Sequence, residues 1–366
     1  MTRFWTMVGS SVVAVGLAAT SLAADAGLKE SGNPELKSAG PIAFGPPGVL
    51  FVADPQSAAI FAIGVDAPAK AEAKEVKVDG IDAKVAAALG TKAGDITIND
   101  LAVQPGTDNV FLSVSRGKGP DAQAVIVRTG ADGKISALPL EKVNYAKLAL
   151  GNAPDAGKKD KRGNSQRTES ITDLAFFEGK LFIAGLSNEE FASKLRSIAW
   201  PFQSAESGVS VEIYHGAHGE LETRSPVRTF VPFNVGGEPQ LLAAYTCTPL
   251  VRFPISELKE GAKVRGTTIA ELGNQNRPLD IIAYEKDGKS FLLIANSARG
   301  VMKISTDGIE AAGTIEERVE GIKGQKYDTV EGWTGIEQLD KLDATRAVVL
   351  RKAEGGGLSL ESLPLP

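Results

Sequence analysis

A short pattern recurs four times along the chain: an apolar–alanine–apolar stretch, a turn containing Gly or Asn, and a second apolar stretch that includes Phe. The copies lie at residues 41–53, 100–113, 173–184 and 280–295. Each stretch is short and bounded by turn residues, which predicts β-strands rather than helices. A unit of this size cannot bury its own apolar residues, so neighbouring units must pack against one another.

Fainter copies at residues 240–253 and 347–360 bring the number of units to six. Four-stranded units that bury both faces against their neighbours form a β-propeller. We therefore predict an all-β fold, a β-propeller of six blades, with seven blades as the alternative. The last copy lacks an outer strand, and residues 34–40 are expected to supply it and close the ring. One or two short helices are expected as insertions, at residues 82–89 and 187–199.

Residues 40–54 read Gly-Pro-Ile-Ala-Phe-Gly-Pro-Pro-Gly-Val-Leu-Phe-Val-Ala-Asp, with Ala-Ile-Phe at 59–61. This segment resembles an NHL-type propeller repeat and is similar to gluconolactonase-type propellers. The resemblance is good over the first copy, fair over three others and poor elsewhere. It implies the propeller fold, which hosts binding, hydrolysis and redox chemistry alike. In gluconolactonase-type relatives a ring of Glu, Asn and Asp holds a catalytic metal.

The first 24 residues have the composition of a secretory signal peptide. Arg3 precedes the apolar stretch at 5–19, and small residues end the segment at 21–24. The apolar stretch is short for a membrane span. We expect a signal peptide at 1–24, one propeller domain at 25–366, export to the periplasm or the medium, and no stable membrane span after cleavage.

Charge and cysteine content limit the partners. The formal net charge of −5 argues against nucleic acid as a partner. A single cysteine allows no disulfide within the chain, so core burial must stabilise the exported domain. We expect a monomer whose partner is a small polar ligand or a protein.

Two groups of residues could bind a metal or act as a nucleophile, but each also has a simpler structural explanation. His215 and His218, the only histidines, could hold zinc or copper. The repeat instead aligns them with an ordinary turn between third and fourth strands, on the face opposite the usual ligand site. Cys247 aligns with a loop on the ligand face, but no base lies near it in the sequence, which favours a small residue at a strand end.

The preferred site is the mouth of the central channel, where the loops entering first strands meet the loops between second and third strands. Carboxylates and amides there suit Ca²⁺ or another divalent cation, or the hydroxyl groups of sugars and lactones. The Asp residues that begin successive inner strands have an alternative explanation, in which each one only caps a repeated turn. The candidates at this mouth are Asp54, Asp100, Arg116, Glu169, Asp173, Asp280, Asn296 and Arg299.

These features lead to three hypotheses. The first is a binding or scaffold module that presents the channel mouth to a protein or small polar ligand. The second is a cation-dependent hydrolase or lactonase of gluconolactonase type, and the third is a metal- or quinone-dependent redox propeller. The sequence does not decide whether the protein is an enzyme.

Overall fold

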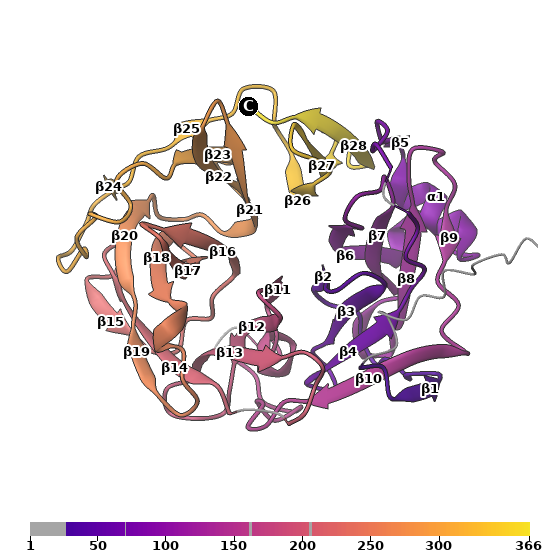
Figure 1. Ribbon diagram of the computed structural model, residues 1–366, viewed down its shortest axis with the longest axis horizontal. Coiled ribbons are helices and arrows are strands. Elements are labelled where there is room, and N and C mark those ends of the chain that lie inside the picture. The colour runs from indigo at the N-terminus through magenta and orange to yellow at the C-terminus, as the bar shows by residue number, and fades with distance from the viewer. Residues whose placement is uncertain (1–26, 70, 161–162, 205–206) are drawn as a thin grey trace, which may run out of the picture.

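The computed structural model describes residues 27–366 except 70, 161–162 and 205–206. Its strands form six sheets that stand around a central opening like the blades of a propeller (Figure 1). The predicted six-bladed β-propeller is confirmed, and the seven-bladed alternative is wrong. The predicted signal peptide at 1–24 lies outside the described residues. Within the described residues, no helix is long and apolar enough to cross a membrane.

Each blade is named here by its innermost strand. The β2 blade contains, from the channel outward, β2 (Ile42–Phe44), β3 (Val49–Asp54), β4 (Ala59–Gly64), β10 (Val143–Ala149) and β1 (Glu30–Gly32). The β6 blade contains β6 (Ile96–Val103), β7 (Val110–Arg116), β8 (Gln123–Thr129) and β9 (Ser136–Ala137). The β11 blade contains β11 (Asp173–Phe177), β12 (Lys180–Leu186), β13 (Ser193–Ala199) and β14 (Val209–His215), with β15 (Glu220–Glu222) and β19 (Lys263–Arg265) beside β14.

The other three blades come from the second half of the chain. The β16 blade contains β16 (Thr229–Val235), β17 (Glu238–Ala244), β18 (Pro249–Pro254), β20 (Thr267–Leu272) and β24 (Ile322–Gly324). The β21 blade contains β21 (Pro278–Lys286), β22 (Lys289–Asn296), β23 (Gly300–Ser305) and β25 (Asp328–Thr329). The β26 blade contains β26 (Ile336–Lys341), β27 (Arg346–Lys352), β28 (Leu358–Pro364) and β5 (Lys77–Asp79).

The blades do not follow one another around the ring in chain order. Contacts between inner strands give the order β2, β6, β26, β21, β16, β11 and back to β2 (Figure 1). After β4 the chain adds β5 to the β26 blade, builds the whole β6 blade, and returns to add β10 to the β2 blade. This path is possible because a sheet edge pairs through backbone groups, whichever part of the chain supplies the next strand.

Strand β5 closes the ring. It runs antiparallel to β28, with Val78 opposite Leu360. The expected closure by residues 34–40 is wrong, because β5 and not that segment supplies the outer strand of the β26 blade. The backbone N–H groups of Lys37 and Ser38 instead donate to the carboxylate of Asp54, at 2.8 and 3.0 Å.

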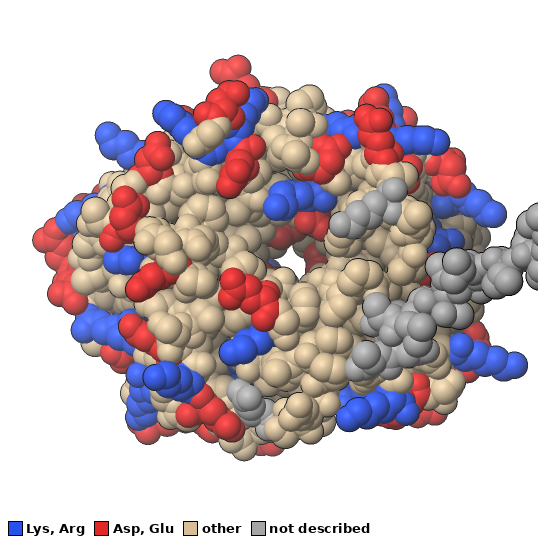
Figure 2. Space-filling model, viewed as in Figure 1, with Lys and Arg blue, Asp and Glu red and all other residues tan. Residues whose placement is uncertain are grey.

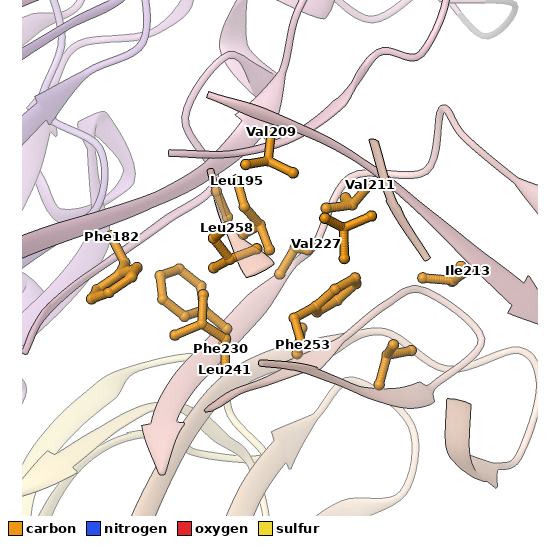
Figure 3. Close-up of a cluster of buried hydrophobic side chains, with 14 of the residues drawn as sticks. Phe182, Leu195, Val209, Val211, Ile213, Val227, Phe230, Leu241, Phe253 and Leu258 are labelled. Atoms are coloured by element: carbon orange, nitrogen blue, oxygen red, sulfur yellow. The ribbon is translucent and has the colours of Figure 1, made fainter. Parts of the chain in front are cut away.

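The hydrophobic core consists of six clusters, one between each pair of neighbouring blades. Alternation along single strands explains this arrangement, since successive side chains point to opposite faces of a sheet. In β3, Phe51 packs toward the β11 blade, whereas Leu50 and Val52 pack toward the β6 blade. Figure 3 shows the cluster between the β11 and β16 blades, where Phe182 and Leu195 approach Phe230.

The first expected helix is confirmed. Helix α1 spans Ile81–Ala88, and Gly90, with a φ of 66°, ends it in the left-handed region that favours glycine. Ile81 and Val85 are buried between the β6 and β26 blades. Elsewhere in the described part of the chain, the helical segments are four 3₁₀ turns at Ala93–Asp95, Gly119–Asp121, Gln166–Glu169 and Ile255–Glu257.

The second expected helix, at 187–199, is wrong, because its second half forms β13. Lys, Leu and Arg favour helices in isolation, but the full ladder with β12 overrides that preference. Leu195 and Ile198 are buried. Lys194 is also buried, where it forms an ion pair with Glu189 and donates to Ser210 at 2.9 Å.

We predict that Val78→Asp destabilises the protein strongly, because it places an unpaired carboxylate in the core beneath the closing strand. The free energy of unfolding should fall by about 3–5 kcal/mol. Lys77→Ser changes the exposed neighbour on the same strand and should stay within about 0.5 kcal/mol of the wild type. Urea denaturation measures both variants. Equal midpoints for the two would show that β5 does not contribute to ring closure.

Candidate functional site

All six inner strands face a cavity on the ring axis of about 890 Å³. The space-filling view shows the opening at the centre of the molecule (Figure 2). Strand register places the beginnings of inner strands beside the ends of second strands, as in Asp173 opposite Ala184 and Pro278 opposite Asn296. The two sets of loops expected at the channel mouth therefore share one face.

Three aspartates occupy matching positions at the channel. Asp100, Asp173 and Asp280 lie on β6, β11 and β21, which are alternate blades of the ring. They line the same cavity and are partly exposed to it. In the sequence, each of these aspartates precedes a Leu-Ala or Ile-Ile pair at the start of an inner strand. Their convergence on the channel was predicted from this pattern.

Each of these carboxylates joins two neighbouring blades. One oxygen accepts a hydrogen bond from the next residue of its own strand, at 2.8 Å in all three cases. The other accepts from the adjacent inner strand: Ile42 N–H donates to Asp100 at 2.8 Å, and Phe230 N–H donates to Asp173 at 2.7 Å. Leu339 N–H donates to Asp280 at 2.9 Å. Inner strands have no further strand beyond them, so these N–H groups would otherwise lack a protein partner.

Two further members of this network were not predicted from the sequence. Asp340 joins β26 to β6, accepting from Val103 at 2.8 Å and from Lys341 at 2.7 Å. Gln338, with its amide oriented to suit its neighbours, donates to Asp100 at 3.2 Å and to Asp280 at 2.9 Å. The last copy of the repeat is too degenerate to align these residues, because Asp340 is followed by Lys341 and not by a pair of apolar residues.

Burial controls the protonation of the channel carboxyls. It raises the pKa of Asp173 to about 7 and that of Asp340 to about 6. Burial also raises the pKa values of Asp100 and Asp280 well above the usual range, and the negative charges of the neighbouring aspartates add to this effect. In each case desolvation outweighs the hydrogen bonds that favour the charged form.

We predict that stability falls as pH rises from about 5 to about 8. A raised pKa means that the folded state keeps protons which the unfolded state releases above about pH 4, so stabilisation is lost as pH rises through the folded pKa. Asp173→Asn removes one of these titrations and should flatten the curve. Thermal unfolding across this range tests both statements. A wild-type melting temperature that rises with pH would contradict them.

The channel carboxylates do not form a ready cation cage. No three of them bring ligand oxygens within 4.8 Å of one another; in the described part of the chain, His215, His218 and Cys247 alone form such a group. A Ca²⁺ or other divalent-cation site at the aspartate ring therefore stays a prediction.

The channel mouth also carries a charged cluster. Arg228 donates to Glu169 at 2.7 Å and to the hydroxyl of Thr246 at 3.1 Å. Arg277 lies near both charged groups, and burial followed by the repulsion of Arg228 lowers its pKa. Glu169 was predicted here. Arg228 was missed because it precedes a strand whose copy of the repeat is faint.

The other predicted mouth residues mainly hold loops. Asp54 accepts hydrogen bonds from the backbone and hydroxyl groups of Ser38 and Ser57, among others. Asn296 accepts from Asn276 at 3.1 Å. Arg116 donates to Gln123 at 3.3 Å, and Arg299 donates to the carbonyl of Asn274 at 3.1 Å.

The turn that carries His215 and His218, called the histidine turn, lies on the other face of the propeller from the one predicted. The pair was placed between third and fourth strands, on the face opposite Cys247. The structure shows that β14 is itself the fourth strand, because β13 is a strand and not a helix. The turn after β14 therefore reaches the Cys247 side, and the three side chains meet.

Comparison with known protein structures shows distant likenesses, and three examples follow. Searches against family models and curated proteins return no match. The chain is similar to extracellular domains 1–2 of Drosophila Semaphorin 1b, with a TM-score of 0.40, 11% identity, and 90% of this chain and 85% of that chain covered. A Bacteroides uniformis protein provisionally assigned as a 6-phosphogluconolactonase gives a TM-score of 0.32 and 12% identity, covering 85% and 73% of the two chains.

The extracellular region of Plexin A4 gives a TM-score of 0.42 and 9% identity, with 92% of this chain but only 40% of the plexin chain covered. All three TM-scores are below 0.5. The fold assignment therefore rests on the sheets and ring described above, and the NHL-type resemblance stays a prediction.

Proposed function

We propose that the chain is an exported binding protein that takes a small polar ligand into its central channel. The observation that carries this proposal is the layer of three carboxyl groups, Asp100, Asp173 and Asp280, that face one cavity from alternate blades. Export is inferred from the signal-like composition of residues 1–24.

The dimensions and chemistry of the channel support a small ligand. Its volume of about 890 Å³ lies within the usual range of small-molecule sites. Carboxyl groups with raised pKa values exist partly as neutral acids near neutral pH, so they can both donate to and accept from hydroxyl groups. Phe177 and Phe233, both partly exposed, also line the cavity and offer apolar surface to the carbon skeleton of the same ligand. A polyhydroxylated compound matches both surfaces.

The arrangement of the carboxylates favours binding over cation-dependent hydrolysis. Both oxygens of each ring aspartate accept a backbone N–H, which holds them in place as parts of the wall. In these positions no three ligand oxygens come within 4.8 Å of one another, as a shared catalytic cation would need. The charged cluster of Glu169, Arg228 and Arg277 at the mouth supplies polar contacts for a ligand that enters from that face.

We predict that Ala175→Leu abolishes ligand binding without unfolding the protein. Ala175 lines the cavity, and a leucine there fills channel volume while leaving every carboxylate unchanged. The matched control is Ala199→Leu, at an exposed position on β13. Calorimetric titration with a panel of sugars, polyols and amino sugars identifies a ligand for the wild type and then compares the variants. Equal affinity in both variants would place the ligand outside the channel.

A further inference from the structure

A second cluster of chemically active side chains lies at the junction of the β11 and β16 blades. His215 ends β14, and His218 lies in the tight turn that follows, where Gly219 N–H donates to the carbonyl of His215 at 2.8 Å. Cys247 belongs to the loop between β17 and β18. One ring nitrogen from each histidine and the sulfur of Cys247 lie within 4.8 Å of one another. Ligand atoms this close can share one metal ion.

A single carboxylate lies beside both imidazole rings and forms a hydrogen bond with that of His218. Oε1 of Glu222 lies 2.9 Å from Nδ1 of His215 and 2.5 Å from Nδ1 of His218. Ser225 donates to the other oxygen of Glu222 and so fixes the carboxylate. Because Nδ1 of each ring faces Glu222, Nε2 is left as the nitrogen available to a ligand. Carboxylates hold metal-binding histidines in this way.

Buried atoms without partners give an independent sign of a missing ligand. The side chain of His215 is only 2% exposed, and neither Nδ1 nor Nε2 of its ring forms a hydrogen bond, although Nδ1 lies at ion-pair distance from Glu222. A buried polar atom left unsatisfied costs about 1–3 kcal/mol, so native structures rarely keep one without a reason. Oε2 of the buried Glu271 also lacks a partner, while its Oε1 accepts from Gly216 N–H, in the histidine turn, at 2.6 Å.

The loop that carries Cys247 is held in an unusual backbone conformation. Cys247 and Thr248 have φ angles of 63° and 60°, in the left-handed region that non-glycine residues seldom adopt. Two bonds keep the loop there: Cys247 N–H donates to the carbonyl of Asn276 at 2.7 Å, and the Thr248 hydroxyl donates to Gly273 at 2.6 Å. The backbone at Cys247 is therefore held by the segment between β20 and β21 as well as by its own loop.

We propose that His215, His218 and Cys247 bind a Zn²⁺ ion. Two imidazole nitrogens and one thiolate are ligands that Zn²⁺ prefers, whereas Ca²⁺ and Mg²⁺ take oxygen ligands. Binding releases the thiol proton of Cys247 to solvent. Blue-copper centres use the same two histidines and one cysteine and usually add a weak axial methionine. The one methionine in the described part of the chain, Met302, is buried in the core between the β16 and β21 blades, which favours Zn²⁺.

The site leaves one coordination position open to solvent. The side chain of His218 is 47% exposed, and Cys247 is half-buried, so water reaches the ion from one side. Three protein ligands with a fourth position free is the arrangement of exchangeable or catalytic zinc, while structural zinc has four protein ligands. This site lies outside the cavity of the proposed ligand, and its assignment does not depend on that function.

The test is a Zn²⁺ titration of the chelator-stripped full chain by calorimetry, with Co²⁺ as a spectroscopic substitute. We expect one Zn²⁺ per chain and a thiolate-to-Co²⁺ charge-transfer band. His218→Ala and Cys247→Ser should each weaken binding by at least about tenfold, and Glu222→Gln by about 10–100-fold. Cys247→Ser should also remove the Co²⁺ band.

Two controls separate this result from misfolding and from channel binding. Glu220→Gln changes an exposed carboxylate on the same hairpin and should leave Zn²⁺ affinity unchanged. The channel variant Ala175→Leu should also keep its zinc site. Absence of Zn²⁺ binding by the folded wild type, or unchanged affinity in both His218→Ala and Cys247→Ser, would overturn the proposal. A site that accepts Cu²⁺ and not Zn²⁺ would overturn the choice of metal.

Discussion

Burial of apolar side chains on both faces of every sheet is the constraint on which this structure depends. Leu50 and Phe51 are adjacent in β3 and both are fully buried, but they pack against different neighbouring blades. A blade with two such faces needs a neighbour on each side, and an open row of blades would leave two apolar faces in water. Only a closed ring removes both. The short strand β5 matters for this reason out of proportion to its length.

The channel is a second consequence of closure. Each inner strand has one edge that no further strand covers, and its N–H groups require acceptors. Aspartate side chains from the neighbouring blade supply them, as when Asp173 accepts from Phe230. The same residues place ionisable groups around a cavity, where burial shifts their pKa values. The same aspartates therefore stabilise the fold and line the cavity where a ligand would bind. Each binding measurement on an aspartate variant must be accompanied by a measurement of its stability.

The repeat allowed the blade number, the inner strands of four of the six blades and the convergence of Asp100, Asp173 and Asp280 to be predicted. Prediction from the repeat failed where the local secondary-structure preference of a segment disagrees with its tertiary contacts. Residues 193–199 contain good helix formers, yet they extend a sheet because β12 offers a complete partner edge. That one error moved the histidine turn to the wrong face. Asp340 and Gln338 were missed because the last copy of the repeat is too divergent to align.

By itself, the sequence determined that this chain forms short two-faced strands in six units, because alternation and turn residues are local properties that each segment carries alone. Tertiary structure decided which strand completes which blade, since backbone edges pair without regard to chain order. It also decided that His215, His218 and Cys247 meet, although 32 and 29 residues separate the two histidines from the cysteine. Such a meeting depends on how two blades pack together, and no pattern within either blade specifies it.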